Sequence, residues 1–102
     1  MKKYRLLLNG KNFLLNRDGK KQKYGFYQSM FIEADTPKQA GRMAITKIWH
    51  DRELKEITLN SEKDPPQVKL ETFWELDEIY YVNRLEPGRT FYLEIKWWEF
   101  WK

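Results

Sequence analysis

The sequence predicts an α+β fold, in which an antiparallel sheet of about four strands packs one face against one helix, in the order β-β-α-β-β. Apolar and polar residues alternate with the period of a strand in both halves of the chain. Between these halves, residues 36–50 carry a capped pattern with helical period. The 102 residues suffice for one core and are too few for two, so residues 1–102 are expected to form a single domain.

The first two strands are expected over residues 4–15 and 24–34. Asn9-Gly10 interrupts the first strand and suits either a tight turn or a glycine bulge. We favour the bulge, which makes these segments one long hairpin, over a three-stranded meander. Residues 17–23 are polar and basic and contain Asp18-Gly19, so they predict a mobile basic loop.

The helix has the clearest local signal. Thr36 suits the N-cap, Pro37 suits the first helical position, and Gln39 completes a capping box. The helix is expected to run to about His50 and to continue irregularly through residues 51–54. Its apolar arc, which should face the sheet, consists of Ala40, Gly41, Met43, Ala44, Ile45 and Ile48.

The second half of the chain contains two further expected strands. Residues 60–66 include two prolines and predict a connector. Residues 67–76 alternate strictly, so one face should hold Val68, Leu70, Thr72, Trp74 and Leu76. Residues 79–82 are apolar, and their pattern does not decide between helix and strand. Pro87-Gly88 predict a turn. Residues 91–102 predict an aromatic C-terminal strand, with Phe91, Leu93, Ile95 and Trp97 toward the core.

Composition excludes several classes of site. The chain has no cysteine and one histidine, which excludes disulfides, thiolate metal sites and histidine-rich metal sites. Its glycines form neither a dinucleotide-binding nor a P-loop spacing, so no cofactor is expected. No apolar run approaches the ~20 residues of a membrane span. We therefore expect a soluble, cytoplasmic protein.

Catalytic constellations are sparse. His50 and Asp51 are the residue types of a general base and the carboxylate that orients it. However, His50 falls on the polar arc near the helix C-terminus, where a histidine is favourable without any catalytic role. Glu94, Lys96 and the upstream Asp77 have the types of a metal-dependent nuclease core, and this interpretation ranks third. Glutamate and lysine two residues apart also describe the solvent side of any amphipathic strand. We expect no enzyme activity, and no catalytic or metal residue.

Charge is unevenly placed along the chain. Residues 1–47 hold eleven basic and three acidic residues, whereas residues 48–102 hold eight and twelve. Lysines lie next to aromatic residues in the first hairpin. This combination binds single-stranded nucleic acid, because lysines contact phosphates and bases stack on the rings. The alternative hypothesis is therefore a nucleic-acid-binding module whose candidate surface is Lys20, Lys21, Lys23, Tyr24 and Tyr27.

The C-terminus is the most unusual feature. Ten of the 17 aromatic residues lie in residues 73–102. A terminal strand is often an edge strand, and exposed rings beside an edge favour association. The leading hypothesis is a binding domain for a protein partner or a second copy of itself, as a homodimer. Its candidate interaction surface is Tyr92, Trp98, Phe100 and Trp101. A tail that covers the domain's own core remains the alternative.

Several short stretches carry a resemblance to known proteins. Asn12-Phe13-Leu14-Leu15, Gly25-Phe26-Tyr27, residues 31–37 and Asp64-Pro65-Pro66, in that order, resemble a family of small uncharacterised bacterial proteins with no assigned activity. This resemblance implies a small single-domain bacterial protein. A weaker resemblance, carried by residues 33–37 with Ala40 and Ala44, is to HicB-type antitoxins, which also place a hairpin before a capped helix. The basic loop at 17–23 departs from their pattern, and no DNA-binding helix-turn-helix or ribbon-helix-helix segment follows.

Overall fold

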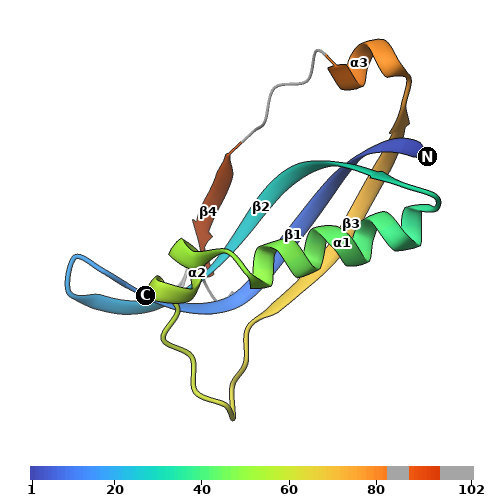
Figure 1. The fold of residues 1–102 in the computed structure, drawn as a ribbon. Coiled ribbons are helices and arrows are strands. Elements are labelled where there is room, and N and C mark those ends of the chain that lie inside the picture. The colour runs from blue at the N-terminus through green and yellow to red at the C-terminus, as the bar shows by residue number, and fades with distance from the viewer. Residues whose placement is uncertain (83–87, 95–102) are drawn as a thin grey trace.

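The structure, a computed structural model, describes residues 1–82 and 88–94. Its elements are β1 (Lys2–Arg17), β2 (Lys20–Ala34), α1 (Pro37–Trp49), α2 (Arg52–Ile57), β3 (Gln67–Leu76), α3 (Glu78–Val82) and β4 (Arg89–Leu93). The four strands form one antiparallel sheet in the spatial order β3-β1-β2-β4 (Figure 1). The predicted α+β class with a four-stranded antiparallel sheet is confirmed.

The hairpin of β1 and β2 is longer than expected. Pairing runs from Lys2 opposite Ala34 to Arg17 opposite Lys20. The expected loop over residues 17–23 is therefore wrong in extent, because residues 20–23 belong to β2. The turn is confined to Asp18 and Gly19, whose φ angles of 53° and 82° suit a two-residue hairpin turn that matches the strand twist.

The expected bulge lies in β1, but two residues beyond Gly10. Pairing with β2 shifts between Gly10 and Phe13, so that two residues of β1 oppose one of β2. The left-handed residue of this bulge is Asn12, with φ 61°. Gly10 serves a different purpose, since a methyl group there would overlap the ring of Phe26.

The start of α1 confirms the predicted cap. The backbone N–H of Gln39 donates to the Thr36 hydroxyl at 3.1 Å, and the Gln39 side chain accepts from the N–H of Asp35 at 2.9 Å. The helix ends at Trp49. Residues beyond it form the separate helix α2, because the Asp51 carboxylate caps a new start by accepting from the N–H of Leu54 at 3.2 Å.

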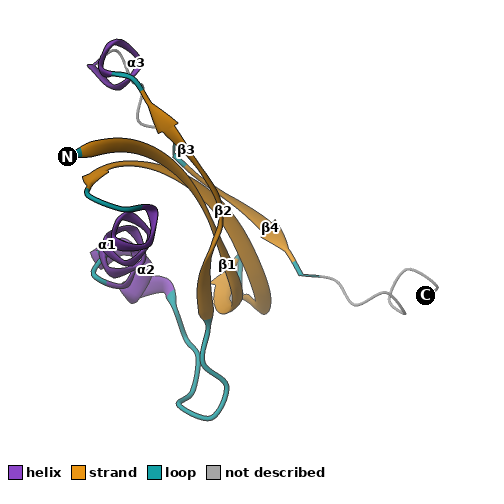
Figure 2. Ribbon diagram, turned by 90° about the vertical axis from the view of Figure 1, so that its right-hand side faces the viewer, coloured by secondary structure: helices purple, strands orange, loops and turns teal. Residues whose placement is uncertain are grey.

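One face of the sheet is covered and forms the core. Figure 2 shows α1 and α2 on the concave side of the curved sheet. The side chains buried there come from both central strands and both helices. They are Tyr4, Leu6, Leu8, Phe13, Leu15, Tyr24, Phe26, Ile32, Ala34, Ala40, Ala44, Ile48 and Leu54.

The predicted alternation of β3 is wrong beyond Leu70. The pairing of β3 with β1 shifts between Leu7 and Leu8, which leaves Glu71 as an extra residue. Such a bulge reverses the faces of all residues that follow. Phe73, opposite Leu6, therefore shares the covered face with Leu70, whereas Trp74, opposite Arg5, points away from α1.

The last described elements resolve part of what the sequence left open. The apolar piece at 79–82 belongs to the short helix α3, where Asp77 accepts from the N–H of Tyr80 at 3.0 Å. β4 spans Arg89–Leu93 and so begins two residues before the expected final strand at 91–102. Residues 95–102 of that strand lie outside the described residues, as does Pro87 of the expected turn. In residues 1–82 and 88–94, no helix has the length and apolarity to cross a membrane.

Candidate functional site

The face of the sheet opposite α1 and α2, termed here the helix-free face because neither of those two helices covers it, gathers charged and aromatic side chains. Residues directly opposite one another in antiparallel strands share a face, so the strand register decides which side chains belong to it. The members used below are Lys3, Arg5, Asn9, Lys21, Lys23, Tyr27, Phe31, Lys69, Trp74 and Tyr92. α3 touches one end of this face, where the ring of Tyr81 meets Phe31 at 6.4 Å between ring centroids.

Cations and rings are interleaved on this face. The Arg5 guanidinium carbon lies 5.4 Å from the ring centroid of Trp74. Farther along the sheet, the rings of Tyr27 and Tyr92 lie 5.5 Å apart. Trp74 is 47% exposed and Tyr27 is 44% exposed. Both rings are therefore accessible to a ligand that stacks on them.

The two central strands make this face basic. β1 and β2 carry eight basic residues and one acidic residue, and Lys3, Arg5, Lys21 and Lys23 are among the basic residues on this face. Lys3 pairs with Glu33 at 3.8 Å, and Lys69 pairs with Glu71 at 3.3 Å. The Glu71 carboxylate raises the pKa of Lys69 and keeps that lysine charged. Exposed ion pairs of this kind are weak, so a phosphate group can take the place of the carboxylate.

Asn9 is the one fully buried polar residue among the described side chains. Its Nδ2 donates to the carbonyl of Phe26 and to the Tyr92 hydroxyl, both at 3.0 Å. The Tyr92 ring lies directly over Gly25, where a methyl group would overlap it. Tyr92, expected on the interaction surface, is thus held partly buried against the sheet. The sequence analysis missed Asn9, whose only signal was one amide in an apolar strand.

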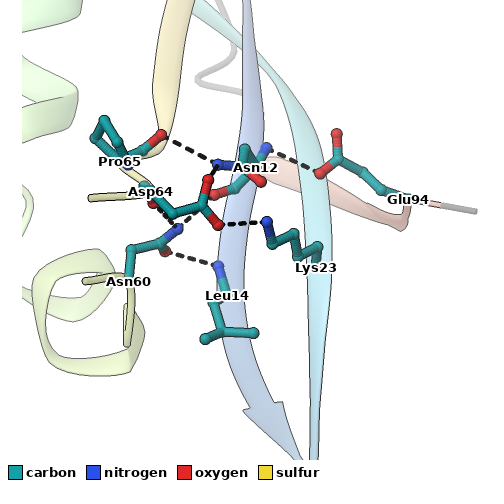
Figure 3. Close-up of polar contacts among 7 residues, drawn as sticks. All are labelled: Asn12, Leu14, Lys23, Asn60, Asp64, Pro65 and Glu94. Carbon is teal, nitrogen blue, oxygen red and sulfur yellow. Dashed lines mark hydrogen bonds and ion pairs between the residues drawn. The ribbon is translucent and has the colours of Figure 1, made fainter. Parts of the chain in front are cut away.

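A polar cluster fastens the connector to the bulge of β1 (Figure 3). Asn60 donates to the carbonyl of Asn12 and accepts from the N–H of Leu14, both at 2.7 Å. The Asn12 side chain donates to Asp64 at 2.8 Å. Lys23 and Asn12 together lower the pKa of Asp64, with the Lys23 contact the larger cause. This cluster positions the chain between α2 and β3.

The expected nucleic-acid residues divide between the two faces. Lys21, Lys23 and Tyr27 belong to the helix-free face, whereas Lys20 and Tyr24 belong to the covered side. Tyr24 is 7% exposed and packs in the core, so its ring is not available for stacking. Lys23 is half-buried and pairs with Asp64. Arg5, Lys69 and Trp74 join this surface only through the pairing of distant strands.

The remaining members of the expected interaction surface, Trp98, Phe100 and Trp101, lie outside the described residues. β4, which leads toward them, is an edge strand of the described sheet. Its Leu93 is 39% exposed on the covered side. The described part of this surface therefore consists of a short edge and a partly buried tyrosine.

The candidate catalytic pairs are not assembled. Asp51 binds Arg89 at 2.8 Å instead of His50, and Arg89 lowers the pKa of Asp51. Glu94 accepts from the N–H of Asn12 beside the bulge (Figure 3), whereas Asp77 follows the opposite end of the sheet. Along β1, about ten residues separate Asn12, which Glu94 contacts, from the end of β3, which Asp77 follows. Glu94 and Asp77 are therefore roughly 33 Å apart along the strand direction. Lys96 lies outside the described residues.

Comparisons with known proteins add no relative. No protein-family model, no curated protein and no solved structure matches the chain. The resemblances drawn from short stretches of the sequence therefore stay expectations, and the function is argued from the geometry alone.

Proposed function

We propose that the chain is a small non-enzymatic binding domain whose helix-free face binds nucleic acid. The observation that carries this proposal is the interleaving of cations and exposed rings on the sheet face that α1 and α2 do not cover, with Arg5 against Trp74 and Tyr27 exposed beyond them. Cationic side chains neutralise phosphates, while rings provide stacking surfaces for bases.

Two features of the described structure favour this function over the sequence's leading hypothesis. Lys21 and Lys23 share one face with Arg5 and Trp74, toward the other end of the hairpin, which the linear sequence did not indicate. In contrast, Tyr92 is turned against the sheet, with its hydroxyl bonded to Asn9. The described residues therefore support binding through the side chains of the sheet more than binding through Tyr92.

Salt dependence tests the proposal. Anisotropy of a fluorescent oligonucleotide should report binding that weakens about 20-fold between ~50 and ~200 mM salt if three phosphates of a single strand are contacted. The Lys21→Glu variant should bind several-fold more weakly, because this exposed lysine points to the helix-free face. Lys38→Glu is the matched control, since Lys38 is an exposed lysine on α1. Binding that ignores salt, or equal loss in both variants, would contradict the proposal.

Association through the C-terminal strand is the second candidate function. β4 lies at one edge of the described sheet, and its last residue, Leu93, is 39% exposed. The other edge, β3, carries a bulge at Glu71 and the charges of Lys69 and Glu75, which oppose strand pairing. A protein partner or a second copy would therefore pair with β4, where Trp98, Phe100 and Trp101 follow in sequence.

Light scattering at micromolar concentration tests this second candidate. The wild-type chain should have the mass of a homodimer, and Leu93→Lys should shift it toward the monomer, because a charge at the edge opposes pairing. Ile57→Lys is a matched control, since Ile57 is 44% exposed but lies in α2. A monomeric wild-type protein would rule out self-association, and a pull-down with Leu93→Lys as comparison would then test another partner.

A further inference from the structure

We infer that the helix-free face takes single-stranded nucleic acid and seats one amino-bearing base, such as cytosine, against Trp74. This inference rests on the proposed function and assigns its ligand class. It comes from a hollow of about 400 Å³ at the α3 end of the sheet. Its lining residues are Arg5, Trp74, Glu75, Leu76, Asp77 and Tyr80.

The walls of this hollow suit a base. Two of its lining side chains are rings, and they are accessible, since Trp74 is 47% and Tyr80 is 68% exposed. Every base has a face that can stack on such a ring. Arg5 lies on Trp74 and adds a cation beside the site. The hollow therefore offers stacking at the level where β3 leaves the sheet.

The hollow holds a carboxylate, which suits the edge of a base better than a phosphate. Asp77 lines it with a carboxylate that would repel a phosphate group, whereas Glu75, opposite Tyr4, points to the covered side and pairs with Lys2 at 3.8 Å. Carboxylates instead accept hydrogen bonds from exocyclic amines, and cytosine N4 is the base donor they usually meet. Asp77 uses Oδ1 to cap α3, which leaves its second oxygen with acceptor capacity. Thymine has no such amine, so this hollow should prefer cytosine.

The spacing of the rings favours a single strand. Trp74 pairs with Arg5, and Tyr27 pairs with Asn9, four residues farther along β1. That separation is about 13 Å along the strand direction. Bases stack on separate rings only when they are splayed out, as in single strands, because a duplex keeps them within its own stack. Trp74 and Tyr27 can thus meet different bases of one strand.

Binding of matched oligonucleotides tests the inference. The probes are fluorescent oligo(dC) and oligo(dT) of about 12 nucleotides, within the ~4–16 that single-strand-binding domains cover, and a hairpin duplex. Oligo(dC) should bind about fivefold more tightly than oligo(dT), and the duplex most weakly. Trp74→Ala should weaken binding of both single strands about tenfold. Trp49→Ala is the control, because Trp49 is 37% exposed but lies in α1.

A second variant isolates the carboxylate. Asp77→Ser retains a residue that caps helices well but withdraws the acceptor from the hollow. It should bring the affinities for oligo(dC) and oligo(dT) to the same value, because only cytosine offers an exocyclic amine to the carboxylate. Circular dichroism should show that all three variants keep the wild-type fold.

The outcomes separate the inference from the proposed function. Equal binding of duplex and single strands, with Trp74→Ala neutral, would overturn the inference but leave nucleic-acid binding standing. Loss in Trp74→Ala without any preference for oligo(dC) would overturn the assignment of the base. No binding of any probe at low salt would overturn the inference and the proposed function together.

Discussion

Phe26 and Tyr27 are neighbours in β2 and point to opposite faces of the same sheet. Phe26 is fully buried and meets the rings of Phe13 at 5.1 Å and Phe91 at 5.7 Å. Tyr27 is 44% exposed and meets Tyr92 alone among the ring contacts of the described residues. The covered face holds the fold together by close packing, which leaves the helix-free face able to carry exposed rings and charges.

The largest expected effect comes from these two neighbours. Phe26→Ala should lower the free energy of unfolding by ~3–5 kcal/mol, because it opens a cavity among buried rings. Tyr27→Ala should lower it by ~1 kcal/mol, the scale of one aromatic pair. Chemical denaturation of both variants measures the difference. Similar losses would show that the helix-free face is as tightly packed as the covered one.

The next effect concerns the contact that ties the helices to β4. Asp51 caps α2 and binds Arg89, whose side chain is 13% exposed. Asp51→Ala should destabilise the protein by about 2 kcal/mol, since it removes a cap and leaves the arginine with Gln28 as a neutral partner in place of a carboxylate. Glu53→Ala, an exposed acidic neighbour, should be nearly neutral in the same denaturation experiment. Equal losses would mean that the Arg89 contact adds no stability.

The cap of α1 should have a smaller effect. Thr36→Ala should cost ~1 kcal/mol, because the N–H of Gln39 loses its acceptor. Thr36→Ser keeps the hydroxyl and should be close to wild type. Thermal unfolding of the two variants checks this, and a neutral Thr36→Ala would show that the covering helix does not depend on its cap.

The smallest effect is a pH dependence confined to the covered side. Arg89 holds the pKa of Asp51 below its ordinary value of 3.8. The carboxylate therefore contributes stability above pH 3.8, and this contribution is lost as pH falls below that value through the folded pKa. Wild-type stability should fall more steeply than that of Asp51→Asn below pH 4 in acid titrations followed by fluorescence. Parallel curves would exclude Asp51 as a source of the acid sensitivity.

The parts that the sequence predicted well depend on neighbours in the chain. Thr36, Pro37 and Gln39 act within one helical turn, so their pattern located the start of α1. The alternation of residues 24–34 located β2, because side-chain direction follows the backbone. The Asp18-Gly19 turn was visible, but the length of the strands around it was not, since polar residues can also pair at the end of a hairpin.

The parts that the sequence missed depend on distant contacts. Glu71 became a bulge through pairing with β1, and this turned Trp74 onto the face of Arg5. Asn12 has the left-handed conformation of the first bulge. Asp64 and Asn60, which hydrogen-bond to it there, follow in the chain only after α1 and α2. No local pattern specifies either partner.

The sequence by itself determined the α+β class, the strands on either side of the first turn and the cap of α1, because propensity and periodicity act over a few residues. It also located the excess of positive charge in the first half of the chain. Tertiary structure alone decided that Arg5, Tyr27, Lys69 and Trp74 share the face opposite α1 and α2 and that Tyr24 does not belong to it. The register of strands and the position of each bulge set that outcome, since one inserted residue exchanges the faces of all that follow.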